Sequence, residues 1–65
     1  MEINLTLTEA QARYIRGAIL TRNLKVLGNY DICYKRGDIQ GAKEWMDAHN
    51  DGKEVVRMID AQLFS

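Results

Sequence analysis

The chain has 65 residues, is 46% apolar and carries no net charge, because nine Lys and Arg balance nine Asp and Glu. This length predicts one domain over residues 1–65, and no apolar run approaches the roughly 18 residues that a membrane span needs. One Cys and one His exclude a disulfide within the chain and a structural zinc site. Residues 1–4 lack the basic and apolar regions of a signal peptide, which favours the cytoplasm.

Residues 1–8 alternate between apolar and polar side chains. Ile3, Leu5 and Leu7 fall on one side, which is the period of a half-buried strand. Thr8 then has the character of a helix N-cap, and Gln11 lies at the reciprocal position of a capping box. The pattern predicts a short strand that ends where a helix begins.

Residues 9–27 predict a helix that ends at Gly28 and Asn29, a pair typical of a left-handed C-cap. Its apolar residues fall into two stripes, whereas a surface helix needs only one. The second stripe therefore predicts a further covering surface, and periodicity leaves open which stripe faces inward. The first stripe comprises Ala12, Ile15, Ile19 and Val26, and the second comprises Ala10, Gly17, Leu20, Leu24 and Leu27.

Residues 29–36 fit two patterns. Tyr30, Ile32 and Tyr34 alternate as a strand would, whereas Asp31 and Lys35 have the spacing of a helical ion pair. Because aspartate is poor in strands, we favour a helix here.

The rest of the chain predicts two further helices. Asp38 caps one that runs to about His49. Residues 50–52 read as a break, after which Asp51 caps a final helix whose apolar face reaches Leu63.

The predicted fold class is α+β and mainly α: one short N-terminal strand followed by two to three helices. A single strand is not stable alone, so we expect it to pair with the same strand of a second copy. A chain this short also builds a weak core, which favours a dimer or higher oligomer. The predicted oligomer interface comprises Ile3, Leu5, Leu7, Leu20, Leu24 and Leu27.

Reactive side chains are few and scattered. The only serine is Ser65, Cys33 has no histidine near it in the sequence, and His49 closes an apolar helical stripe. Nucleophilic catalysis needs a nucleophile held by a base, so we predict no enzyme, no catalytic residue, no metal site and no cofactor.

Bases and aromatic rings interleave between residues 22 and 36. Such a mixture can hold phosphate and stack on a nucleotide, which predicts a nucleotide or small-anion site at a subunit junction. A nucleic-acid module is the weaker alternative, because the isoelectric point near 6.5 lacks the usual basic footprint. The candidate ligand-binding residues are Arg22, Lys25, Tyr30, Tyr34, Lys35 and Arg36.

Residues 5–8 have the sequence Leu-Thr-Leu-Thr ahead of an Arg-containing helix, and Gly28-Asn29-Tyr30 precedes a second helical segment. These two short motifs resemble those of small bacteriophage proteins. The similarity covers residues 3–34. The resemblance implies a phage-encoded protein in the cytoplasm of an infected bacterium, directed at a host component. We therefore expect a non-enzymatic binding protein that inhibits or sequesters a host protein through an oligomeric helical scaffold.

Overall fold

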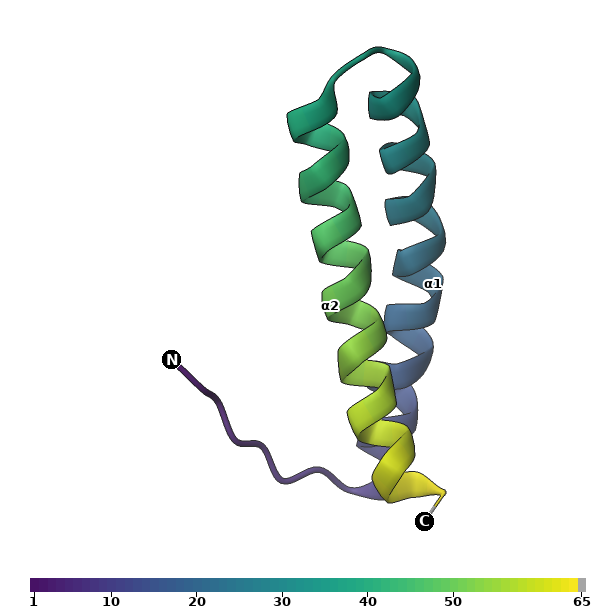
Figure 1. Cartoon of the computed structure of the whole chain (residues 1–65). Helices are drawn as coiled ribbons and strands as arrows, with labels where there is room; N and C mark the ends of the chain where they lie inside the picture. Colours follow the sequence, from purple (N-terminus) through teal and green to yellow (C-terminus); the bar gives the residue numbers. More distant parts are fainter. Residues whose placement is uncertain (65) are drawn as a thin grey trace.

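The computed structural model describes residues 1–64, which form an antiparallel helical hairpin (Figure 1). Helix α1 spans Glu9–Lys35, and helix α2 spans Ile39–Leu63. The segment before α1 is extended and runs away from the hairpin. The hairpin is elongated: its radius of gyration is 14.0 Å, against about 11 Å for a compact chain of this length.

The start of α1 is confirmed. The Gln11 amide donates to Thr8 Oγ1 at 3.1 Å, and the Thr8 amide donates to Gln11 Oε1 at 2.9 Å. These two bonds complete the capping box, which satisfies amides that a helix start leaves without a partner.

The predicted strand is wrong, because the described residues contain helices and no strand. A helix begins directly after Thr8, and a helix has no free backbone edge with which an extended segment could form sheet hydrogen bonds. Ile3 and Leu5 are 72% and 74% exposed, so the apolar side of this segment is not buried within the chain. The α+β fold is therefore replaced by an all-helical hairpin.

The predicted end of α1 at Gly28 is also wrong, whereas the preference for helix over residues 29–35 is confirmed. Glycine is tolerated inside a helix at a cost of about 1 kcal/mol relative to alanine. Asn29 and Tyr30 are half-buried, so packing favours continuation. Lys35 Nζ lies 2.9 Å from Asp31 Oδ2, which is the ion pair that the spacing predicts.

The turn between the helices depends on Gly37. Its φ of 79° is left-handed, a conformation that glycine adopts without a steric cost. Asp38 then caps α2 as predicted, its Oδ1 accepting from the Gly41 amide at 2.9 Å. The chain therefore reverses at Gly37 rather than at Gly28.

Helix α2 passes through residues 50–52 without a break, so the predicted separate final helix capped by Asp51 is wrong. A Cβ built on Gly52 would lie 2.7 Å from Asn23 Oδ1 and 3.1 Å from Ile19 Cγ2. Gly52 is therefore the point where the two helices approach closely, and its missing side chain serves packing rather than helix termination.

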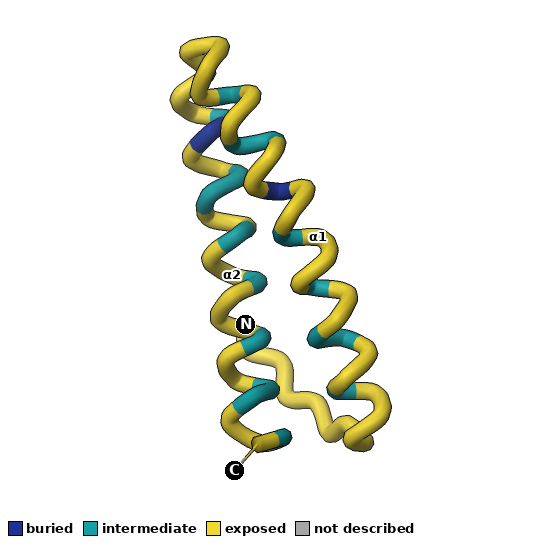
Figure 2. The backbone as a smooth tube through the Cα atoms, turned by 90° about the vertical axis from the view of Figure 1, so that its right-hand side faces the viewer, coloured by how far each residue is buried: buried dark blue, intermediate teal, exposed yellow. Residues whose placement is uncertain are grey.

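Buried and half-buried positions recur at alternating spacings of three and four residues on both helices (Figure 2). This is the spacing of an antiparallel coiled coil. We call these positions the seam. On α1 the seam comprises Ala12, Arg16, Ile19, Asn23, Val26, Tyr30 and Cys33, and on α2 it comprises Ala42, Trp45, His49, Gly52, Val56, Ile59 and Leu63.

The core of one hairpin is small. Among residues 1–64, only Val26 and Ala42 are fully buried, at 2% and 3% exposure. Two helices have a single shared line of contact, so most seam side chains are covered on one side and open on the other. This weak core agrees with the expectation from chain length.

Candidate interaction surface

Three leucines of α1 lie outside the seam, and we call them the leucine stripe: Leu20, Leu24 and Leu27. They are 44%, 73% and 39% exposed. At about 100° per residue they lie roughly a quarter turn around the helix from the seam. The first predicted stripe thus packs against α2, whereas every position of the second stripe remains exposed.

The leucine stripe borders a groove between the helices. This groove has a volume of about 330 Å³, and its rim carries charges of both signs. Leu20 therefore connects the stripe on α1 to the surface of α2. The groove is lined by Leu20, Asn23, Lys53, Val56, Arg57 and Asp60.

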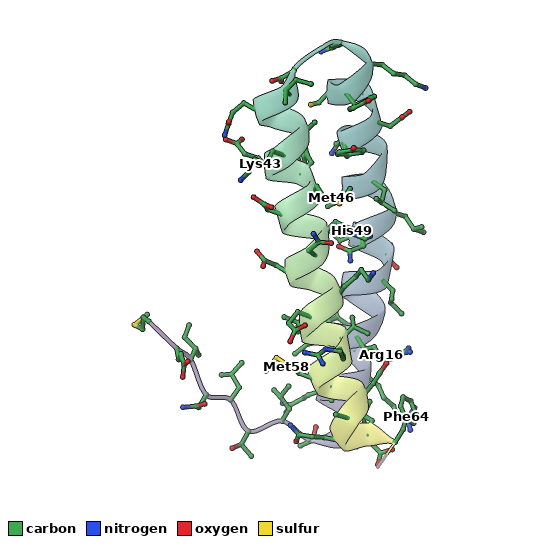
Figure 3. The ribbon with its side chains drawn as sticks, viewed as in Figure 1. Arg16, Lys43, Met46, His49, Met58 and Phe64 are labelled. Carbon is green, nitrogen blue, oxygen red and sulfur yellow. The ribbon has the colours of Figure 1, made fainter. Side chains whose placement is uncertain are left out.

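The open end of the hairpin is held by an ion pair between the helices. Arg16 Nε donates to Asp60 Oδ1 at 2.6 Å, and both side chains are about one-third exposed. The guanidinium of Arg16 lies 5.8 Å from the centre of the Phe64 ring, as does that of Arg13 (Figure 3). Such cation–π contacts reinforce the pair.

The middle of the seam is polar. Asn23 Nδ2 donates to the His49 carbonyl oxygen at 3.2 Å. His49 Nδ1 is buried and has no hydrogen-bond partner within the described part of the chain. Because polar groups replace apolar contacts here, the middle of the hairpin contributes little hydrophobic stabilisation.

The first seven residues form what we call the N-terminal arm, residues 1–7. Its apolar side chains are exposed, and they include three positions of the predicted oligomer interface: Ile3, Leu5 and Leu7. The accessible surface of the whole chain is 5429 Å². A compact monomer of 7.5 kDa exposes roughly 4,200 Å².

The predicted ligand-binding residues do not gather at one place. Tyr30 and Tyr34 stack, with ring centres 6.0 Å apart, and Tyr30 belongs to the seam. Lys35 pairs with Asp31, and Arg36 is the C-cap of α1. By helical spacing, Arg22, Lys25 and Arg36 lie on the opposite flank from the two tyrosines.

Arg22 and Lys25 instead line a shallow groove of about 580 Å³ on the surface of α1. Sequence reasoning missed Arg13 and Tyr14 as members of this surface, although their spacing to residues 17, 18 and 21 indicates a shared helix face. The groove combines three cations with an aromatic ring. Its lining residues are Arg13, Tyr14, Gly17, Ala18, Thr21, Arg22 and Lys25.

Residues 1–64 contain no group of three His, Cys, Asp or Glu side chains that could hold a metal ion. Cys33 is half-buried in the seam.

A hydrogen bond from Arg57 lowers the pKa of Glu54 below its ordinary value of 4.5, on an exposed face of α2. Neither α1 nor α2 combines the length and apolar content that crossing a bilayer requires.

No protein-family model, no curated protein and no solved structure matches this chain. The resemblance to small bacteriophage proteins therefore stays a prediction. The function is therefore inferred from the geometry and chemistry of the leucine stripe, the N-terminal arm and the groove on α1.

Proposed function

We propose that this chain is a non-enzymatic binding protein, an accessory protein of the bacteriophage type that works in the host cytoplasm. It inhibits or sequesters a host protein through an oligomeric helical scaffold. The observation that carries this proposal is the set of large apolar side chains that one copy leaves exposed on the N-terminal arm and the leucine stripe.

The exposed area supports a binding role. The chain exposes about 1,200 Å² more than a compact monomer of its mass. A standard protein–protein interface covers about 800 Å² on each partner. The excess, which the arm and the elongated hairpin share, is therefore large enough for at least one such contact.

The two apolar surfaces suit different tasks. The leucine stripe lies on a regular helix, which suits a rigid contact between scaffold helices. The N-terminal arm is extended and presents Ile3 and Leu5 two residues apart. An extended segment with apolar side chains at alternate positions fits an apolar groove on a partner. We therefore assign the arm to the host target.

The test compares the full chain with an Ile3→Ser/Leu5→Ser double variant and a Glu2→Gln/Asn4→Ser control. The control changes the polar side of the same arm. Each protein is used to capture partners from a bacterial lysate, and the retained protein is identified by mass spectrometry and then purified for calorimetry. We expect one stoichiometric partner, whose affinity falls at least tenfold with the double variant and stays with the control.

Equal binding by all three proteins, or no partner at all, would contradict the assignment. Circular dichroism checks that the hairpin is intact in each case. The helices begin after the arm, at Thr8 and Glu9, so the arm substitutions should leave helicity unchanged.

A second candidate function is supported by the groove on α1, where Arg22, Lys25 and one tyrosine suit a nucleotide or small anion, whereas Arg13 is already paired with Glu9. The test is a thermal-shift panel of nucleotides and inorganic phosphate on the full chain and on an Arg22→Gln/Lys25→Gln variant. Binding raises the melting temperature in proportion to the logarithm of ligand concentration. No shift with any member of the panel would exclude this function.

A further inference from the structure

We infer that the N-terminal arm binds its target as an added β-strand. The arm pairs with the free edge of a sheet in the target protein, and Ile3, Leu5 and Leu7 lie over an apolar surface beside that edge. This inference deepens the proposed function and rests on it. It names the kind of surface that the target must present.

The capping box keeps the arm from binding as an extension of α1. At Thr8 the backbone is extended, with φ −70° and ψ 162°, and the Thr8 amide donates to the Gln11 side chain at 2.9 Å. A further helical turn before Thr8 would need helical angles at this residue and would break the capping box. In a helix, moreover, Leu5 would point away from Ile3 and Leu7, whereas in a strand all three share one side.

The backbone of the arm is available for pairing. Residues 2–7 contain neither proline, which lacks an amide donor, nor glycine, which weakens a strand. In the part of the chain that the structure describes, main-chain hydrogen bonds begin at Thr8, whose carbonyl accepts from the Ala12 amide. The arm runs away from the hairpin (Figure 1), so its amides and carbonyls are open to a partner.

These open amides and carbonyls decide which apolar surface fits the arm. A purely apolar groove would cover Ile3 and Leu5 and also strip water from the backbone between them, and a buried amide without a partner is unfavourable. The edge strand of a sheet offers carbonyls and amides in matching alternation, so it satisfies the backbone while the apolar side chains are buried. As a strand, residues 2–7 span about 20 Å, the usual strand length. The apolar groove that fits this arm therefore has a strand edge as one wall.

The two sides of the arm describe the sheet. Glu2, Asn4 and Thr6 alternate with the apolar residues, so the added strand has one apolar and one polar side. This matches the edge of an antiparallel sheet that has one face on an apolar core and the other in water. The arm of a second copy fits less well, because two arms alone would make a two-stranded ribbon, which is marginally stable in water. A foreign protein that already has a sheet is the better partner.

The first experiment modifies the backbone of the arm and leaves its side chains unchanged. A chain of 65 residues can be made by chemical synthesis, so a single amide can be N-methylated at Ile3, Asn4, Leu5 or Thr6. Each methyl group removes one donor and blocks one edge of the strand. Calorimetry measures the affinity of each synthetic chain for the purified protein that the unmodified chain captures from a bacterial lysate.

Along a strand, successive amides point to opposite edges, and only one edge faces the sheet. We therefore expect the affinity to fall about tenfold or more at two alternating positions, either Ile3 and Leu5 or Asn4 and Thr6, and less than about threefold at the other two. The tolerated pair is the matched control, because it carries the same modification on the same segment. The helices begin after the arm, so all four chains should have equal helicity in circular dichroism.

The second experiment uses hydrogen exchange and needs no modification. The isotope-labelled chain is bound to the purified partner, and the exchange rates of the arm amides are measured by NMR. Alternate amides of residues 3–6 should exchange more slowly in the complex, because carbonyls of the edge strand accept from them. The amides between them should exchange as they do in the free chain.

Three outcomes would overturn the inference: a captured protein that is entirely helical, four modified chains that all bind as tightly as the unmodified chain, or four that all bind weakly. A captured protein that is still lost with Ile3→Ser/Leu5→Ser would leave the proposed function standing in each case. Failure to capture any protein would contradict the proposed function itself, and the inference would fall with it.

Discussion

The two faces of α1 contrast with each other. The seam contains Arg16 and Asn23 and yet packs against α2, whereas the leucine stripe contains only leucines and remains exposed. Apolar content does not separate the two faces, because the flank of α1 that carries the leucine stripe also contains Arg13 and Asp31. Which face of α1 is buried within one copy therefore depends on the side chains that α2 offers for contact.

Two specific contacts join α2 to the seam residues of α1. Gly52 admits the Asn23 side chain, and Asp60 pairs with Arg16. Of the leucine stripe only Leu20 lines the groove, whose α2 side consists of Val56 and three charged residues, Lys53, Arg57 and Asp60. A stripe of leucines therefore remains available for another chain.

The largest expected effect comes from an aspartate placed on each face. Val26→Asp puts a charge without a partner into the most buried position of the seam, which costs several kcal/mol. We expect this variant to lose its helical signal in circular dichroism. Leu24→Asp, two residues away, should keep the helices of the hairpin. Equal helicity in both variants would contradict the contrast between the two faces.

The next effect concerns glycine on the two faces. Gly52→Val places a branched side chain where Asn23 and Ile19 leave no room, so we expect a loss of about 2 kcal/mol in the free energy of unfolding. Gly28→Val meets nothing within 4 Å and serves as the control. Urea unfolding measures both, and a similar result for the two would show that Gly52 is not a packing position.

A smaller effect is expected at the ion pair that closes the open end. Asp60→Asn removes the charge that Arg16 meets, and because both groups are partly exposed we expect a loss of about 1 kcal/mol. A double-mutant cycle with Arg16→Gln isolates the coupling between the two residues. A coupling indistinguishable from zero would remove this pair from the contacts that align the helices.

The smallest effect lies on the solvated face of α2. Because Arg57 lowers the pKa of Glu54, the pair stabilises the folded state above the ordinary value of 4.5, and this contribution is lost as the pH falls through the lowered pKa. Carboxyl chemical shifts measured by NMR during an acid titration test this. Arg57→Gln should return the pKa of Glu54 to its ordinary value, and an unchanged value would exclude Arg57 as the cause.

Local signals in the sequence predicted the starts of α1 and α2, but they also predicted a start at Asp51, which lies inside α2. Thr8 and Asp38 act as caps as expected, because capping depends on residues three positions away and on nothing distant. The preference for a helix over residues 29–35 followed from the ion-pair spacing of Asp31 and Lys35 and from the poor fit of aspartate to strands. The candidate ligand residues were placed less well, because closeness in sequence does not put residues on one helix face.

The strand and the helix ends were predicted wrongly for a related reason. Alternation over residues 3–7 describes the side chains of an extended segment, but a strand also needs a neighbouring strand, which this hairpin does not offer. Gly28 and Gly52 resemble helix terminators locally. Gly52 instead packs against Asn23 and Ile19, a contact that periodicity does not contain, whereas Gly28 lies inside a continuous helix with nothing within 4 Å of a Cβ built on it.

The sequence by itself determined where each helix begins, that α1 has two apolar stripes, and that one copy has a small core. Only the tertiary structure decided which stripe packs against α2, that the helices continue through Gly28 and Gly52, and why glycine stands at position 52. The physical reason is that capping is a contact between near neighbours in the chain. The choice of a packing face depends on the match between two helices whose contacting residues are distant in the chain, as Arg16 and Asp60 are at 44 positions apart.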